Sequence, residues 1–125
     1  MSVQTVGSTV VLHLPAQGSP IASEQDALDL VGDTWGTGAE VLAVPVERLA
    51  PEFFDLRTGL AGAVTQKLVS YHLRLAVLGD IDKHLEGSGA LRDFVRESNR
   101  GRHVWFLADA EALTARLSGG AGSPA

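Results

Sequence analysis

Hydrophobic and polar positions follow two periods along the chain, and together they predict strands that alternate with single helices. Short apolar or alternating runs of the kind that form strands occur at Val3–Val6, Thr9–Leu14, Glu40–Pro45, Leu73–Leu78 and His103–Leu107. Apolar residues at helical spacing predict helices over 24–35, 59–72, 89–99 and 110–117. The expected order is therefore β-β-α-β-α-β-α-β-α.

This order favours an α/β fold with a largely parallel sheet, because single helices between strands imply right-handed crossovers. Gly7-Ser8 is typical of a tight hairpin turn, so the first two strands make the sheet mixed. We expect one domain over residues 1–117 and a flexible tail over 118–125, whose Gly- and Ser-rich composition buries little. Residues 45–55 are predicted to be irregular or a short helical turn, and 83–89 a polar loop.

Helix starts carry recognisable capping residues. Ser23 with Asp26 resembles a capping box, and Ser88 or Gly89 opens the third helix. Asp109 is placed to cap the last helix and Thr58 the second. Trp35 and Trp105 are expected in the core.

Composition narrows the classes of function. The chain has 125 residues, no cysteine and a formal net charge of −5. Disulfides and thiolate chemistry are excluded, and an acidic protein is a poor general binder of nucleic acid. The N-terminus shows no signal-peptide pattern, and no apolar run is long enough to span a bilayer. We expect a cytoplasmic protein without membrane contact.

The candidate functional residues lie where the predicted strands end, since ligands of parallel sheets bind beyond the carboxyl ends of the strands. Three segments reach that edge: Phe53–Gly62, Gly79-Asp80 and Leu107–Asp109. Thr58 is either an N-cap or a phosphothreonine switch, because a helix N-terminus stabilises an anion. Gly59 and Gly62 either permit close approach of a backbone or ligand, or are packing residues.

Two further clusters have both a structural and a functional interpretation. Asp80 is a turn residue or an acid or base beside Arg57. Asp80, Asp82 and His84 do not make up a metal site, because zinc and hard cations need more protein ligands than these three side chains provide. We therefore predict neither a metal nor a cofactor.

The second cluster is the segment Glu97-Ser98-Asn99-Arg100-Gly101. It is a helix C-cap or a polar recognition corner in which Asn99 and Arg100 face a partner. The neighbouring arginines, Arg92, Arg96, Arg100 and Arg102, alternate with Asp93 and Glu97, which favours pairing on a solvated face.

Two long segments, EFFDLRTGLAGAVTQKLVSYHLRLAVLGD and LRDFVRESNRGRHVWFLADAEAL, resemble the bacterial family called domain of unknown function 4180. The resemblance extends from about Ala27 to Leu117. A looser resemblance connects the chain to STAS domains, including anti-sigma factor antagonists, in which a D-S-S-G-L segment carries a serine phosphorylated by a partner kinase. Here the segment Asp55–Leu60 is one residue longer, and Thr58 is its one hydroxyl residue.

Two functions remain open at this point. The first is a STAS-like regulatory or protein-interaction module with a surface formed by Asp55 to Gly62 and the corner at 97–100. In it Thr58 is the switch, and Arg57 and Arg100 bind a phosphate or carboxylate of a protein or small anionic partner. The second is a small-molecule binder or metal-free biosynthetic enzyme, with a pocket against residues 45–55 and Asp55, Asp80 or Glu97 as acid or base. A purely structural subunit is a third possibility, and a homodimer is compatible with each of the three.

Overall fold

The computed structural model describes residues 1–122 and contains one five-stranded sheet. The strands are β1 (Ser2–Val6), β2 (Thr9–His13), β3 (Val41–Pro45), β4 (Arg74–Leu78) and β5 (Val104–Leu107), and they lie side by side in chain order. β1 and β2 form an antiparallel hairpin, and every later pair is parallel. The predicted mixed, mostly parallel sheet is confirmed.

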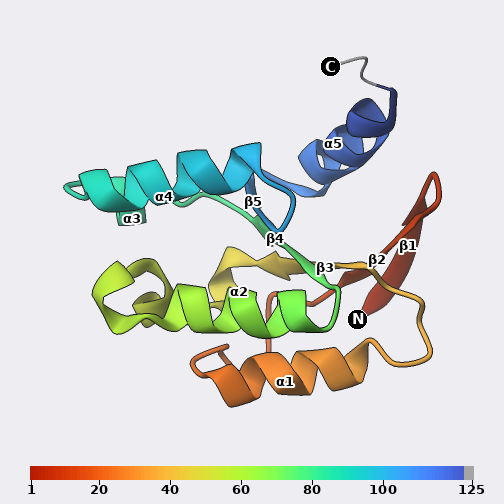
Figure 1. The fold of residues 1–125 in the computed structure, drawn as a ribbon, viewed down its shortest axis with the longest axis horizontal. Coiled ribbons are helices and arrows are strands. Elements are labelled where there is room, and N and C mark those ends of the chain that lie inside the picture. The colour runs from red at the N-terminus through yellow and green to blue at the C-terminus, as the bar shows by residue number, and fades with distance from the viewer. Residues whose placement is uncertain (123–125) are drawn as a thin grey trace.

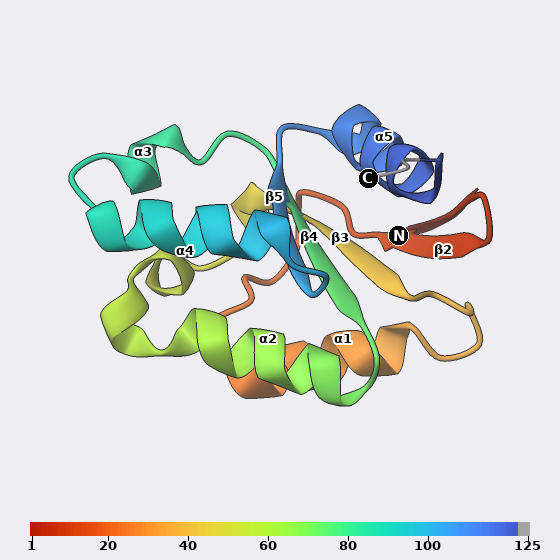
Figure 2. The same ribbon diagram turned by 45° about the horizontal axis from the view of Figure 1, so that its top comes forward.

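Three crossover helices cover one face of the sheet, and the last helix covers the other. α1 (Glu24–Asp33), α2 (Leu60–Ser70) and α4 (Gly89–Arg100) form a layer, while α5 (Ala110–Gly122) crosses the opposite face (Figures 1 and 2). Strands in chain order with crossovers of one hand place their helices on one side. The strand order therefore never reverses, and the sheet lacks the switch point at which doubly wound folds bind ligands.

Strand residues alternate between two apolar clusters because successive side chains point to opposite faces of a sheet. In β3, Leu42 and Val44 belong to the cluster under α1, α2 and α4, whereas Val41 and Ala43 face α5. Only a small cluster with Leu113 at its centre lies on the α5 side. The near-continuous apolar strands are thus explained by burial on both faces.

At three of the four predicted helix starts, the residue predicted to cap the helix makes the capping hydrogen bond. The hydroxyl of Ser23 accepts from Asp26 N, that of Ser88 from Leu91 N, and the Asp109 carboxylate from Ala112 N. At the fourth start the N-cap position is held by Gly59 with φ of 75°, and the Thr58 hydroxyl accepts from Leu60 N, the first N–H of α2, from one position earlier.

Four segments differ from, or refine, the predicted elements. A short helix, α3 (Asp82–Leu85), replaces part of the predicted polar loop, and Leu85 packs against the core. α5 continues to Gly122, past its predicted end at Leu117, and residues 123–125 of the expected tail lie outside the described residues. Trp35 is 76% exposed because α1 ends before it. Residues 46–58 form three short 3₁₀ turns, at Val46–Arg48, Pro51–Phe54 and Leu56–Thr58.

Within residues 1–122, no helix combines the length and the apolar character needed to cross a membrane.

Candidate functional site

Thr58 lies exposed at the junction between the 3₁₀ turns and α2. Its hydroxyl oxygen lies 2.7 Å from Glu52 O and 2.8 Å from Asp55 O, and it accepts from Leu60 N at 3.2 Å. One side chain therefore connects the turn at Pro51–Phe54, the turn at Leu56–Thr58 and the first residue of α2. A change at this oxygen alters all three connections.

Asp55 and Arg57 form a two-pronged ion pair beside Thr58. Arg57 Nε and Nη2 donate to the two carboxylate oxygens, each at 3.0 Å, and the backbone N–H of Arg57 also donates to Oδ1. The side-chain bond to Arg57, followed by the backbone bond, lowers the pKa of the Asp55 carboxyl below its ordinary value. Arg57 is 90% exposed, so its outer surface is open to solvent.

Asp80 is separate from this ion pair. Its carboxylate accepts from Asp82 N at 2.9 Å, which stabilises the start of α3 rather than pairing with Arg57. His84 stacks on Phe54 with ring centroids 3.9 Å apart. The described residues contain no group of three or more side chains placed to hold a metal ion.

Asn99 connects the end of α4 to the outer edge of the sheet. Its carbonyl oxygen accepts from Phe106 N at 2.7 Å, and its amide donates to Phe106 O at 3.3 Å. β5 is an edge strand, so the N–H and C=O of Phe106 that Asn99 binds would otherwise be free to pair with another strand. Its side chain thus faces the fold, unlike in the predicted recognition corner.

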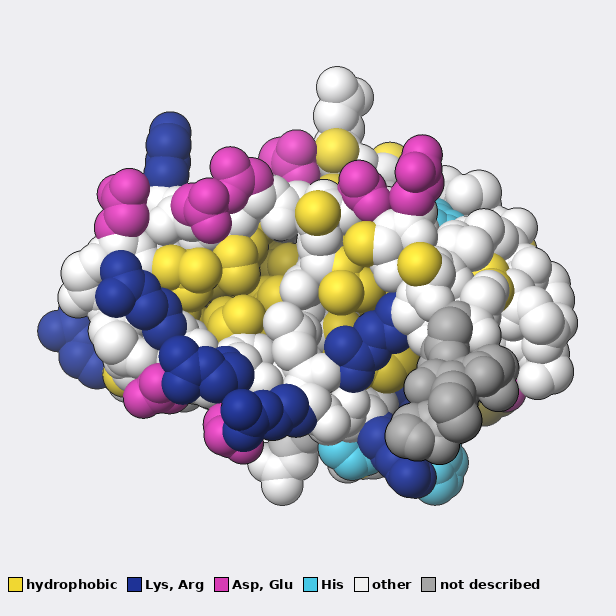
Figure 3. Space-filling model, turned by 90° about the horizontal axis from the view of Figure 1, so that it is seen from above, with side chains coloured by type: hydrophobic (Ala, Val, Ile, Leu, Met, Phe, Trp, Pro, Cys, Tyr) yellow, Lys and Arg dark blue, Asp and Glu magenta, His cyan; other side chains and the backbone are white. Residues whose placement is uncertain are grey.

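The other residues of this corner have different positions. Arg100 is exposed and pairs with Glu97 at 3.5 Å, and Arg96 pairs with Asp93 at 3.4 Å, both at i,i+3 spacing. Ser98 is half-buried and lines a cavity. Figure 3 shows a row of basic side chains on this face with acidic side chains directly beside it, and further acidic side chains beyond exposed hydrophobic ones. The pairs at i,i+3 spacing agree with the predicted pairing on a solvated face.

The space against residues 45–55, where a pocket was predicted, is occupied by aromatic rings. Phe53 and Phe54 are buried, with ring centroids 5.3 Å apart, and Phe53 lies 6.5 Å from Phe106. The carboxylates proposed as acids or bases are dispersed. Asp80 and Glu97 line different cavities, and Asp55 is engaged by Arg57.

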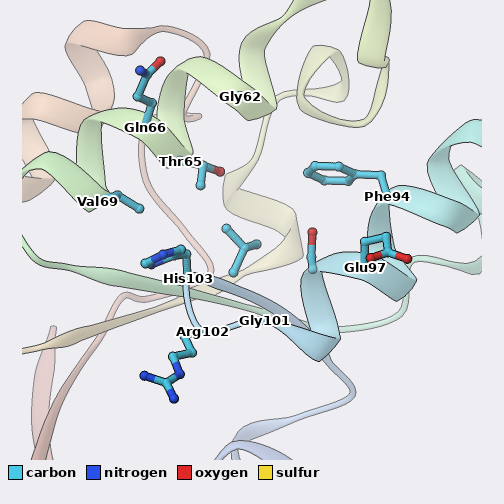
Figure 4. A pocket seen from close by; sticks show the side chains of 11 residues that line it. Gly62, Thr65, Gln66, Val69, Phe94, Glu97, Gly101, Arg102 and His103 are labelled. Atoms are coloured by element: carbon cyan, nitrogen blue, oxygen red, sulfur yellow. The ribbon is translucent and has the colours of Figure 1, made fainter.

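A groove that the sequence did not predict lies between α2 and α4, with a cavity volume of about 460 Å³ (Figure 4). It reaches the start of β5 at residues 101–104, which is the opposite end of the sheet from Thr58. The available signal was the spacing of Gly62, Thr65 and Val69 on one side of α2. That spacing equally fits ordinary packing, so it does not identify a groove.

The architecture defines a small α/β domain with one helical layer, an exposed turn before α2 and a groove behind it. The chain belongs to the family described as a domain of unknown function (DUF4180), whose model matches residues 6–117. No curated protein and no solved structure matches the chain.

Proposed function

We propose that the protein is a regulatory, protein-binding module that is switched by phosphorylation of Thr58. The observation that carries this proposal is the hydroxyl of the exposed residue Thr58, which is bonded at once to Glu52 O, Asp55 O and Leu60 N. The binding surface comprises the turn Phe53–Gly62, with its exposed Arg57 side chain. The partner is a second protein of the cytoplasm.

A phosphate on this oxygen changes the local bonding. The ester removes the hydroxyl proton that bonds to the carbonyl oxygens of Glu52 and Asp55, and it adds a charge of about −1.5 to −2 beside them. We expect the phosphate to compete with Asp55 for the Arg57 guanidinium, since both are anionic acceptors and Arg57 directly precedes Thr58 in the chain. The turn between Glu52 and Leu60 then opens or shifts.

The resemblance to anti-sigma factor antagonist domains supports the proposal, because their phosphorylated serine stands at the start of the corresponding helix. The geometry gives less support to a metal-free enzyme. Asp55, Asp80 and Glu97 do not converge on one cavity among the described residues, and Asp55 is already paired with Arg57.

The test is a comparison of partner binding by Thr58 variants in the host organism. Tagged parent protein, Thr58→Glu, Thr58→Val and Thr58→Ser are recovered from lysate, and bound proteins are quantified by mass spectrometry. Ser70→Glu is the matched control, since Ser70 is an exposed hydroxyl residue at the other end of α2.

We expect at least one partner to distinguish Thr58→Glu from the parent, with Thr58→Ser and Ser70→Glu behaving as the parent does. Circular dichroism of each variant separates loss of binding from loss of the fold. Identical partner sets for folded Thr58→Glu, Thr58→Val and parent protein contradict the proposal.

A further inference from the structure

The groove between α2 and α4 exists because these two helices lie apart. α2 packs closely against α1, whereas α2 and α4 make few direct contacts. The residues of α2 that border the groove are Gly62, Thr65, Gln66 and Val69. A volume of about 460 Å³ is within the range of small-molecule sites.

The inner surface of the groove is apolar. Val69, Phe94 and Val104 contribute side chains to it, and Figure 4 shows the Phe94 ring extending from α4 toward α2. That ring is held by an edge-to-face contact with Phe106, with centroids 6.0 Å apart. Gly62 has open space where a Cβ would stand, so the helix surface there is flat enough for a planar ring.

One polar atom inside the groove has no partner. The hydroxyl oxygen of Thr65 is buried, and among residues 1–122 it is the one buried side-chain nitrogen or oxygen without a hydrogen bond. An unpaired buried hydroxyl costs roughly 1–3 kcal/mol. A bound group with an acceptor oxygen at this position satisfies the hydroxyl.

One cationic side chain, Arg102, lines the groove where it reaches the start of β5. His103 follows it in the lining, and the Arg102 guanidinium is directed away from Thr65 (Figure 4). His103 also borders a neighbouring cavity lined by His72 and Arg74. Within the described residues, neither Arg102 nor Arg74 forms an ion pair. The one acidic lining residue, Glu97, is paired with Arg100.

We propose that this groove binds a small aromatic carboxylate. The carboxylate accepts from the Thr65 hydroxyl, and Arg102, which lines the same groove, supplies a positive charge that no acidic side chain of the described residues pairs with. The aromatic ring lies over Gly62 and against Phe94, where an edge-to-face arrangement is available. The groove shares Gly62 with the Phe53–Gly62 surface of the proposed function, but its other lining residues lie outside that surface, so variants at Thr58 and at Thr65 test the two proposals separately.

The test is an NMR titration of the isotopically labelled protein with 3-phenylpropanoate, and with 3-phenylpropylamine as the cationic analogue. We expect saturable shifts confined to α2, α4 and residues 101–104. The acid is expected to bind up to about fivefold more tightly than the amine, as one exposed charge pair allows.

Three variants locate the bound acid. Gly62→Leu fills the groove and is expected to weaken binding about tenfold or more, the amount that ring burial supplies. Gly32→Leu is the matched control, because Gly32 is also an exposed helical glycine with open space at its Cβ. Thr65→Val is expected to weaken binding of the acid about tenfold, because the hydrogen bond from the hydroxyl to the charged carboxylate is lost. Thr65→Ser keeps a hydroxyl at this position and is expected to retain binding.

Three results overturn the proposal. One is the absence of saturable shifts at millimolar acid. Another is equal affinity of the parent and a folded Gly62→Leu variant. A third is a concentration-dependent dimer that Gly62→Leu dissolves in sedimentation velocity, since that result assigns the groove to a second copy of the chain.

Discussion

Replacing Asn99 by alanine tests whether the corner after α4 serves the fold. The change removes the 2.7 Å bond from Phe106 N and the 3.3 Å bond to Phe106 O. Phe106 is 7% exposed, so its backbone groups lose their partner in a nearly dry position. Most of the cost comes from losing the shorter bond, which leaves the backbone N–H of Phe106 without an acceptor. We therefore expect the free energy of unfolding to fall by about 2 kcal/mol.

For a chain of 125 residues, that loss lowers the melting temperature by about 8 °C. The assay is urea and thermal unfolding followed by circular dichroism. Arg100→Ala is the control, because Arg100 is exposed and its pair with Glu97 is solvated, and we expect a change within about 0.5 kcal/mol.

Asn99→Asp discriminates between the two bonds, since a carboxylate accepts from Phe106 N but does not donate to Phe106 O. Its stability is expected to fall between those of the parent and Asn99→Ala. If the free energy of unfolding of Asn99→Ala lies within about 0.5 kcal/mol of the parent value, which is the range of ordinary surface substitutions, the structural role of Asn99 is refuted.

Three other changes follow from backbone geometry and burial. His72→Gly is expected to stabilise the protein by about 1 kcal/mol in urea unfolding, because His72 has φ of 62° in a helix-end position that favours glycine. Gly79→Ala is expected to cost about 2–3 kcal/mol in the same assay, since its Cβ would lie 2.6 Å from Val46 Cγ1 at φ of +138°; an unchanged midpoint contradicts this. Burial lowers the pKa of His13 from 6.5, so the unfolded chain takes up a proton first and stability falls as pH drops below that value. Denaturation midpoints from pH 7.5 to 5.5 should decline more for the parent than for His13→Gln, and equal slopes exclude this contribution.

Much of the fold was predictable because local patterns and tertiary burial agree. The short apolar run at 40–45 indicates an internal strand, and in the structure Leu42 and Val44 are buried on one face of the sheet and Val41 and Ala43 on the other. Ser23, Ser88 and Asp109 mark helix starts through bonds to residues three positions ahead, which depend on sequence distance alone.

The features that were missed depend on where elements lie in space. Trp35 has the spacing of a core residue, but α1 ends at Asp33 and leaves it outside. The role of Asn99 appears only when α4 ends beside the edge strand β5. The groove exists because α2 and α4 lie apart, and the residue types and spacing of Gly62 and Thr65 in the sequence do not reveal that separation.

The expected location of the site depended on topology as well. Ligand crevices at the carboxyl edge arise where the strand order reverses and helices diverge to both faces. Here the order runs from β1 to β5 without reversal, so that edge carries an exposed turn, and the groove lies within the helical layer.

The measurement that tests the central claim most directly is the phosphorylation state of the protein in its own host. Tagged protein is purified during growth and in stationary phase, and its intact mass and peptides are determined by mass spectrometry. We predict that a fraction of the protein carries the mass of one phosphate group at Thr58, that Thr58→Val lacks it, and that Ser70→Ala retains it. Protein that is unmodified in both phases, or a phosphate at another residue alone, contradicts the claim that Thr58 is the switch.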